Sequence, residues 1–302
     1  MATVGMPVYK RSLLYLFLGL YALLVIYPML WLVASSLKDS WSIFKYPGAL
    51  PTTPHWENYK NAWDMGNLGR KMVNSVAVDT ISLVFILAFS SMAAYAMARF
   101  RFTGNRTLFY LYVAGLGIPV FLGIVPLFIL MKKLAIPEIG PLYRFMKDHS
   151  IPGAEFKLMG SYLGIIILYV AYSLSFTIFI LHGFFKGLPV ELAEAAAVDG
   201  CSPSYTFWRI MLPLAKPGLA TAGIFVFIGL WNEYPLALVF LPDDLKQTLP
   251  VAMASLTAKQ KYQTDWGALF AGLTIGIIPT VILYMIFQKQ IQAGLTAGAV
   301  KG

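Results

Sequence analysis

Charged residues are scarce in this chain, and cysteine is almost absent. Only 12% of the 302 residues are charged, which is about half the share found in a typical soluble domain. The single cysteine, Cys201, excludes a disulfide within the chain and a cysteine-based metal cluster. The three histidines, His55, His149 and His182, are far apart in the sequence and form no ligand pair. These shortages argue against a soluble protein, a disulfide scaffold and a Cys–His metal centre.

Hydrophobic residues make up 58% of the chain, and the mean hydropathy is +0.69. They occur in long unbroken runs rather than periodic faces, which indicates membrane spans and not one large soluble core. Helices are expected because lipid offers backbone groups no other partner, whereas a β-barrel would alternate polar and apolar residues. Six windows with little or no charge mark the spans: 12–37, 72–98 with only Asp79, 107–131, 158–185 with only His182, 217–242 with only Glu233, and 266–288. The sequence therefore predicts an all-α integral membrane protein with six transmembrane helices.

An even number of spans places both termini on one side of the membrane. That side carries ten of the 23 basic residues and the other side carries thirteen, so the count does not decide the orientation. Two local features favour an N-terminus inside the cell. Lys10 and Arg11 precede the first span, and the short connection 99–106 has three arginines and no acid.

A polar, alanine-rich segment, residues 191–213, lies between the fourth and fifth spans. Glu191 and Glu194 suit the early part of a helix, and Gly200 suits its end. Ser202-Pro203 then begins a second short helix, which Pro213 ends. Two interpretations remain open from these residues alone. The segment is either a solvated connector on the membrane surface or a docking surface whose alanines permit close approach of a partner.

The spacing within this segment resembles a known motif. Glu194-Ala195-Ala196, three residues, Gly200, nine residues and Ile210-x-Leu212-Pro213 are similar to the EAA motif of binding-protein-dependent ABC importer permeases. Further stretches resemble the carbohydrate branch of that family, in particular its maltose-permease-like subunit, and the resemblance covers nearly the whole chain. These stretches are Trp231-Asn232-Glu233-Tyr234, Thr248-Leu249-Pro250, Thr264-Asp265-Trp266-Gly267 and the small-residue tail 294–302.

The resemblance implies a type I ABC importer permease fold with a cytoplasmic coupling helix that docks on an ATPase. It implies a second homologous permease, two ATPase subunits and an extracytoplasmic solute-binding protein as partners. It implies no catalytic site, metal or cofactor on this chain, because ATP binds to the partner subunits. The coupling residues would be Glu191, Glu194, Ala195, Ala196, Asp199 and Gly200. Both termini would then lie in the cytoplasm, with the protein in the inner membrane of a bacterium or archaeon.

The resemblance also divides the chain into three regions. Residues 1–71 hold the first helix, about 13–34, and a long extracytoplasmic segment. Residues 72–288 form the transport domain, with helices at about 73–98, 107–131, 159–182, 217–240 and 266–288. Residues 289–302 are a cytoplasmic tail. The outer connection 132–158 is longer than the family leads us to expect, and we interpret it as a surface insertion.

Ionisable residues within spans are expensive and usually functional. Glu233 either accepts hydrogen bonds from sugar hydroxyls or ties its helix to a neighbour. Asp79 either contacts substrate or pairs with Asn74 or the second permease. Trp231 and Tyr234 either stack on a sugar or pack against other helices, and Asn232 lies beside Glu233.

Three classes of function compete at this stage. The first is a sugar-importer permease subunit. The second is an ion-coupled secondary transporter that uses Asp79 and Glu233, but the sequence lacks the internal repeat typical of that class. The third is a membrane enzyme, for which no nucleophile, base or metal cluster is found. No basic cluster lies inside a span, which favours a neutral sugar over an anion, although the sequence does not identify the sugar.

Overall fold

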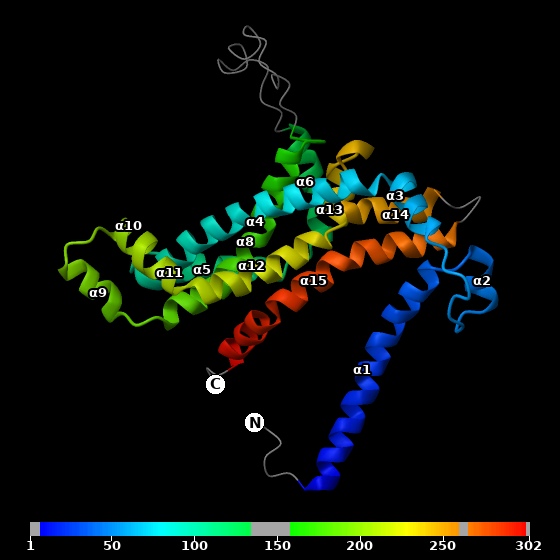
Figure 1. Ribbon diagram of the computed structural model, residues 1–302. Coiled ribbons are helices and arrows are strands. Elements are labelled where there is room, and N and C mark those ends of the chain that lie inside the picture. Colours follow the sequence, from blue (N-terminus) through cyan, green and yellow to red (C-terminus); the bar gives the residue numbers. More distant parts are fainter. Residues whose placement is uncertain (1–6, 134–157, 260–264, 300–302) are drawn as a thin grey trace. The chain divides into compact units, whose positions relative to one another are not determined.

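The computed structural model describes residues 7–133, 158–259 and 265–299, and every regular element in them is helical (Figure 1). The predicted insertion 132–158 falls almost wholly outside these residues. In chain order the elements are α1 Val8–Ser36, α2 Ser40–Lys45, α3 Glu57–Gly66, α4 Leu68–Arg99, α5 Asn105–Gly115, α6 Val120–Lys133, α8 Tyr162–Gly187, α9 Glu191–Val198, α10 Pro203–Tyr205, the π-helix η1 Thr206–Met211, α11 Leu212–Leu214, α12 Lys216–Trp231, α13 Pro235–Phe240, the 3-10 helix η2 Asp244–Lys246, α14 Leu249–Lys259 and α15 Trp266–Ala299.

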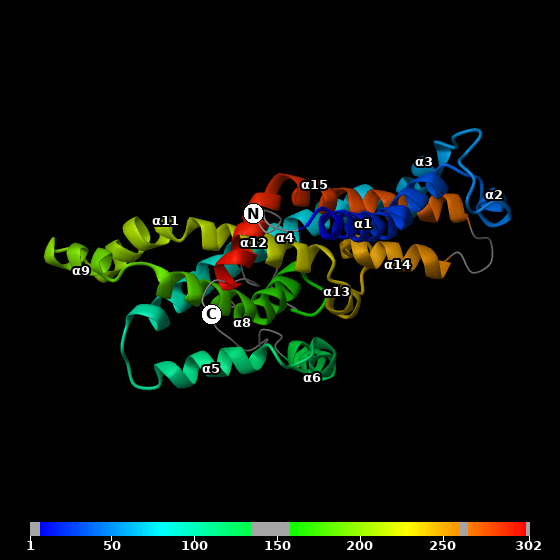
Figure 2. The same ribbon diagram turned by 90° about the horizontal axis from the view of Figure 1, so that it is seen from below.

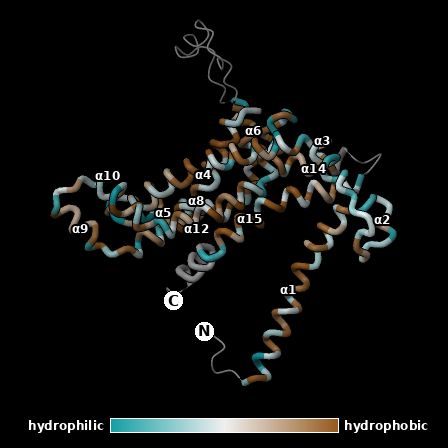
Figure 3. The backbone as a smooth tube through the Cα atoms, in the orientation of Figure 1, coloured by the Kyte–Doolittle hydropathy of each residue, from teal (hydrophilic) through white to brown (hydrophobic). Residues whose placement is uncertain are grey.

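Four helices in the described ranges are long and apolar enough to cross a membrane alone. They are α1, α4, α8 and the part of α15 from Trp266 to Lys289, each with a mean hydropathy of 2.0 or 2.2. Figure 3 shows the hydrophobic residues of α1 along most of its length, with polar residues near its N-terminal end. Two further pairs of helices, α5 with α6 and α10–α11 with α12, pass the same test but are bent by 102° and 73°. The number of spans reaches the predicted six if each bent pair is one span.

Two of the predicted spans are not continuous helices, and proline accounts for both breaks. The predicted helix 107–131 stops at Gly115 and resumes at Val120, directly after Pro119. The predicted helix 217–240 stops at Trp231 and resumes at Pro235. Proline lacks a backbone N–H and disfavours the helical conformation of the residue before it, so a helix ends ahead of it and a new one begins there.

The C-terminal segment 289–302, which was predicted to be a tail after the last helix, also differs from the prediction. Residues 289–299 continue the last helix, since α15 runs from Trp266 to Ala299 without a break. Glycine and polar residues weaken a helix but do not end it when they are isolated between helix formers such as alanine and glutamine. Residues 300–302 lie outside the described part of the chain.

The chain divides into two compact units. The first, residues 1–69 with 252–279, is held by polar contacts between its loops and helix ends. Nδ2 of Asn58 donates to the carbonyl oxygens of Ser36 and Lys38, at 2.9 and 2.8 Å, and Nε1 of Trp31 donates to that of Pro47 at 2.7 Å. These bonds give the long segment after α1 a defined path around α2 and α3.

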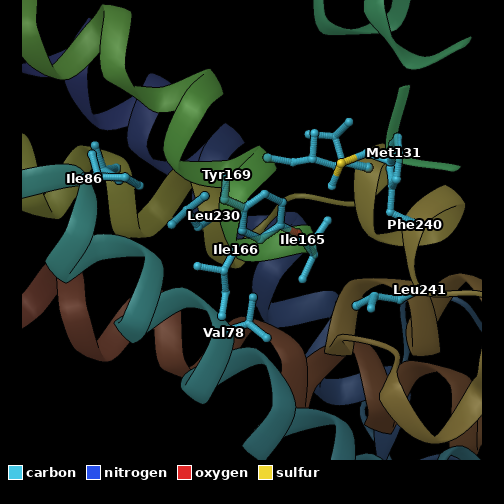
Figure 4. Packing of buried hydrophobic residues seen from close by; sticks show 12 residues of the cluster. Val78, Ile86, Met131, Ile165, Ile166, Tyr169, Leu230, Phe240 and Leu241 are labelled. Atoms are coloured by element: carbon cyan, nitrogen blue, oxygen red, sulfur yellow. The ribbon is translucent and has the colours of Figure 1, made fainter. Parts of the chain in front are cut away.

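The second unit, residues 70–251 with 280–302, is built around α8. Helices α5 and α12 both pack along α8, and the three run side by side in Figures 1 and 2. One apolar cluster centres on Tyr169, which lies among Ile165, Ile166 and Leu230 in Figure 4. A second cluster surrounds Phe185 near the end of α8 that leads into α9. Two packed clusters therefore fix the two ends of α8.

Buried polar contacts tie the beginning of α4 to the connection between α13 and α14. Lys71 is only 2% exposed, and its ammonium lies 2.9 Å from Oδ1 of Asp244. Asn74 donates to the carbonyl oxygens of Leu245 and Gln247, both at 3.0 Å. Buried charges need such partners, so these contacts fix where α4 starts.

The first turn of α8 depends on a close backbone approach at Gly164. A Cβ atom at this position would lie 1.9 Å from the carbonyl oxygen of Leu158, a distance that no side chain tolerates. Replacing Gly164 by alanine should therefore shift the turn that begins α8 and lower the free energy of unfolding by about 1–3 kcal/mol.

The thermal unfolding midpoint of the detergent-purified protein measures this effect. Gly183→Ala is the matched control, because Gly183 lies in the same helix and its Cβ would meet nothing within 4 Å. Equal midpoints for the two variants would contradict the predicted clash.

Candidate functional site

The predicted docking segment forms two helical pieces joined by a tight turn. The first is α9, and the second runs through α10, η1 and α11 from Pro203 to Leu214. Gly200 has a φ of +77°, a left-handed conformation that favours glycine, and it lies just after α9 ends. Ser202 then accepts a hydrogen bond from the backbone N–H of Tyr205 at 3.2 Å and caps the second piece. Figures 1 and 2 both show this segment at one end of its unit.

The second helical piece does not end at Pro213, as predicted, but one residue later. Helix α11 includes Pro213 as one of its first residues, and the six residues before it, Thr206–Met211, are π-helical. A wider π-helical turn changes which carbonyl each N–H faces, so the helix can pass a residue that has no N–H to donate.

The side chains of α9 divide into an exposed set and one buried alanine. Glu191, Glu194, Ala195, Asp199 and Gly200 are exposed, whereas Ala196 is only 4% exposed. Ala196 therefore faces the chain's own core rather than a partner. Within the described ranges, the three acidic residues form no ion pair with a basic side chain.

Two apolar side chains extend the exposed surface of α9 and were not predicted. Val198 is 87% exposed and Leu192 is 37% exposed. The sequence signal for this surface was Val198, a β-branched apolar residue at the end of a polar helix. An exposed apolar side chain in such a place is typical of a contact with a partner.

Arg99 ties the end of α4 to the end of α8, a few residues before α9. It is the last residue of α4, and its Nη2 donates to the carbonyl oxygens of Phe185 and Leu188, at 2.8 and 2.5 Å. Carbonyl groups at the end of a helix have few intrahelical donors, and Arg99 supplies one for this end of α8. The sequence analysis counted Arg99 only among the three arginines of the connection 99–106 and did not predict these hydrogen bonds.

A cluster of aromatic rings supports the same junction. The ring of Tyr95 in α4 lies 5.5 Å from that of Phe185 in α8 and 5.0 Å from that of Phe207 in η1. Edge and tilted contacts at these distances stabilise a fixed arrangement of the rings. The α9–α11 segment is therefore packed against α4 and α8 at this junction.

A cavity of about 470 Å³ lies in the second unit where the two helix breaks meet α8. Its polar lining consists of Glu233 and four α8 residues, Tyr169, Tyr172, Ser173 and Ser175. The rest of its lining is mostly apolar and includes Phe121 after the first break and Pro235 after the second, which follows α12. Irregular backbone at membrane depth is tolerated where it lines a cavity, so this is the place where both breaks are accommodated.

Glu233 lies in the break between α12 and α13, not within a continuous helix as predicted. Its Oε1 accepts from the N–H of Leu236 at 2.7 Å, and its Oε2 accepts from the N–H of Ala237 at 3.0 Å. The hydroxyl of Tyr169 donates to Oε2 at 2.7 Å. Glu233 therefore caps α13, ties it to α8 and lines the cavity at the same time.

Asp79 is buried and has no partner within the described residues. It is 1% exposed, and neither of its carboxylate oxygens has a hydrogen-bond partner. Of the alternatives that the sequence left open for Asp79, pairing with Asn74 is excluded, because the Asn74 amide bonds to Leu245, Gln247 and the hydroxyl of Tyr162 instead. Asp79 is absent from the lining of the cavity.

The other predicted pathway residues lie outside the cavity lining. Trp231 is 3% exposed, and its ring stacks on that of Phe227 with centroids 6.0 Å apart. Asn232 is exposed and donates to the carbonyl of Ile228 in its own helix at 2.8 Å, and Tyr234 is half-buried. The cavity thus includes Glu233 alone of the five predicted residues. Three of the α8 residues in the lining, Tyr169, Tyr172 and Ser173, could have been predicted from the sequence, because they are polar side chains at positions i, i+3 and i+4 of a hydrophobic span.

Residues 86–296 match a known family, described as the binding-protein-dependent transport system inner membrane component. The chain is 38% identical to the diacetylchitobiose uptake system permease protein NgcG of Streptomyces coelicolor, over 92% of this chain and 85% of that one. It is 33% identical to the trehalose transport system permease protein SugB of Mycobacterium tuberculosis, over 93% of each. Its fold is similar to a chain in the crystal structure of a bacterial ABC transporter involved in the import of the acidic polysaccharide alginate. The TM-score is 0.74 at 23% identity, over 94% of this chain and 99% of that one.

The capping role of Glu233 predicts a large effect of its removal. Glu233→Ala should leave the Tyr169 hydroxyl and two backbone N–H groups without an acceptor, at a cost of about 1–3 kcal/mol for each buried group. Tyr169→Phe removes a single donor and keeps the cap, so its loss of thermal stability should be clearly smaller. Unfolding midpoints of the two variants in detergent test this order, and the reverse order would show that Glu233 does not hold the break together.

Proposed function

The chain belongs to the family of binding-protein-dependent transport system inner membrane components, and from this membership we propose that it is the subunit through which a sugar crosses the cytoplasmic membrane. The family works with an extracytoplasmic solute-binding protein and an ATPase. The ion-coupled alternative has no support from the family or from the relatives. The observation that carries the proposal is the 470 Å³ cavity at the meeting point of two broken helices.

The lining of the cavity suits a sugar. Hydroxyl groups of Tyr172, Ser173 and Ser175 and the carboxylate of Glu233 can exchange hydrogen bonds with sugar hydroxyls. Rings such as Phe121 and Phe176 offer flat apolar surface. No basic side chain is found in the described lining, and the single carboxylate disfavours an anion. Two of the relatives are named for neutral oligosaccharides, which supports the same substrate class for this chain.

We assign the exposed side chains of α9 to docking on an ATPase subunit in the cytoplasm. Glu191, Glu194 and Asp199 would meet basic or N–H donor groups there, while Ala195 permits close contact and Gly200 forms the turn. This assignment places both termini in the cytoplasm. A second homologous permease and two ATPase subunits would complete the assembly, with one α9 helix for each ATPase.

The geometry provides a route from the docking helix to the cavity. ATP-driven closure of the ATPases would move α9, and the contacts of Arg99 and Phe207 would pass this movement to α4 and α8. Helix α8 carries Tyr172 about 20 Å along its axis from Phe185, at 1.5 Å per residue. Because α8 lines the cavity, its displacement would change access to that space, as alternating access requires.

The docking assignment predicts uncoupling by a charge reversal on α9. Glu194→Lys should abolish binding-protein-stimulated ATP hydrolysis and uptake, while membrane insertion stays normal, because Glu194 is exposed and has no ion-pair partner to lose among the described residues. Gly200→Asp should have the same effect because aspartate is strained at a φ of +77°. Asp64→Lys in α3, another exposed acid, is the control. Wild-type uptake by Glu194→Lys would contradict the assignment.

The cavity assignment predicts that added bulk blocks uptake. Ser173→Leu should reduce transport by about tenfold or more, since a leucine side chain fills space that the sugar must occupy. Ala171→Leu, an exposed α8 position that does not line the cavity, should leave it unchanged. Uptake of labelled trehalose and diacetylchitobiose into proteoliposomes of the complete transporter measures both. Equal uptake by the two variants would place the sugar path elsewhere.

A further inference from the structure

A second, larger cavity lies away from the transport cavity, at the end of α8 that leads into α9. Its volume is about 820 Å³, and it opens between the end of α8 and the start of α5. We call it the basic groove. Its lining residues are Arg101, Phe102, Thr103, Gly104, Asn105, Arg106, Thr107, Phe109, Tyr110, His182 and Lys186. This lining contains three permanent cations and a histidine, but no aspartate or glutamate.

The three cations are not neutralised by the chain itself. Arg101, Arg106 and Lys186 are exposed, and none of them forms an ion pair with an acid in the residues that the structure describes. The guanidinium carbon of Arg106 lies 5.6 Å from the centre of the Tyr110 ring. The His182 ring packs against that of Phe109, with centroids 4.2 Å apart. Aromatic contacts thus hold part of the groove in place while its positive charge stays available.

The backbone at the start of α5 adds further donors. Gly104 precedes this 11-residue helix and offers no side chain to cap it. The N–H of Asn105 bonds to the carbonyl of Phe102 and that of Leu108 to the carbonyl of Gly104, so the N–H groups of Arg106 and Thr107 are the two that can face an anion placed there. A Cβ atom on Gly104 would meet nothing within 4 Å, so the space in front of the helix is open.

The ends of two candidate spans indicate that the groove lies where the membrane meets water. Spans α4 and α8 end nearby, at Arg99 and Gly187. Beside the cations, Phe100 and Phe102 are each 44% exposed, and Leu111 is 68% exposed. Positive charge next to exposed apolar side chains matches the polar head and the acyl chains of a lipid.

We propose that the basic groove binds the phosphate headgroup of an anionic phospholipid, in the leaflet on the α9 side of the membrane. Free phosphate would pair with the cations but leave the apolar side chains of Phe100, Phe102 and Leu111 exposed to water. An acidic protein surface would also pair with the cations, but it would not bury these apolar side chains at the ends of two spans. Lys186 lies five residues before α9, so a bound lipid would hold the base of the docking helix.

Lipid retention by the full chain, purified in detergent with its partner subunits, tests this assignment. Native mass spectrometry after titration with cardiolipin, phosphatidylglycerol and phosphatidylcholine should show preferential binding of the two anionic lipids. The variant Arg101→Gln/Arg106→Gln/Lys186→Gln should lower this binding by about tenfold or more, since each basic residue near a membrane surface contributes roughly fivefold. Lys60→Gln/Lys132→Gln/Lys133→Gln removes equal charge outside the groove and should bind as the wild type does.

The possible outcomes separate the sources of the ligand. Equal binding by the wild type and the groove variant would overturn the proposal, as would displacement of the lipid by millimolar inorganic phosphate. Cross-linking of Thr103→Cys, in a Cys201→Ser background, to a partner subunit would assign the groove to a protein contact instead. If the triple variant fails to fold, Arg106→Gln alone should still weaken cardiolipin binding severalfold, and unchanged binding would count against the site.

Discussion

Lipid provides no hydrogen bonds, and the second unit is arranged around this one constraint. A helix that stops within the membrane exposes N–H and carbonyl groups, which must find partners inside the protein. At the break after Trp231, the carboxylate of Glu233 supplies acceptors for the first N–H groups of α13 and takes a third hydrogen bond from Tyr169. An irregular segment, which would be costly in lipid without these hydrogen bonds, can therefore form part of the cavity wall. The chain can hold a sugar-sized opening in a hydrophobic environment because one acidic side chain completes the backbone around it.

A polar contact also stabilises the other end of α8. The guanidinium of Arg99, at the end of α4, donates to the carbonyl oxygens of Phe185 and Leu188. It joins the ends of two spans a few residues before α9. In the proposed mechanism, a displacement of α9 would be carried along α8 and taken up where the neighbouring helices are broken.

Much of the fold follows from the sequence because hydrocarbon runs of this length permit little besides helices. The end of α9 at Gly200 and the start of the second helical piece at Ser202 were also readable, because these residues act locally, whereas the predicted stop at Pro213 was one residue early. The breaks before Val120 and Pro235 were missed because a charge-free window measures hydrophobicity and is insensitive to a proline within it. The role of Arg99 and the α8 lining of the cavity depend on contacts between residues distant in the chain. Such contacts are set by how helices rotate against one another, which no local pattern specifies, and for the same reason the sequence left several partners open for Asp79.

The division of α9 into an inward alanine and an outward polar surface has a consequence for how such transporters diversify. Ala196 is packed within the permease, whereas Glu191, Glu194 and Asp199 are exposed. Substitutions at the exposed positions should therefore leave the fold intact. If α9 docks on the ATPase as proposed, a change of these few side chains would pair the same permease with a different ATPase and leave the cavity unaltered.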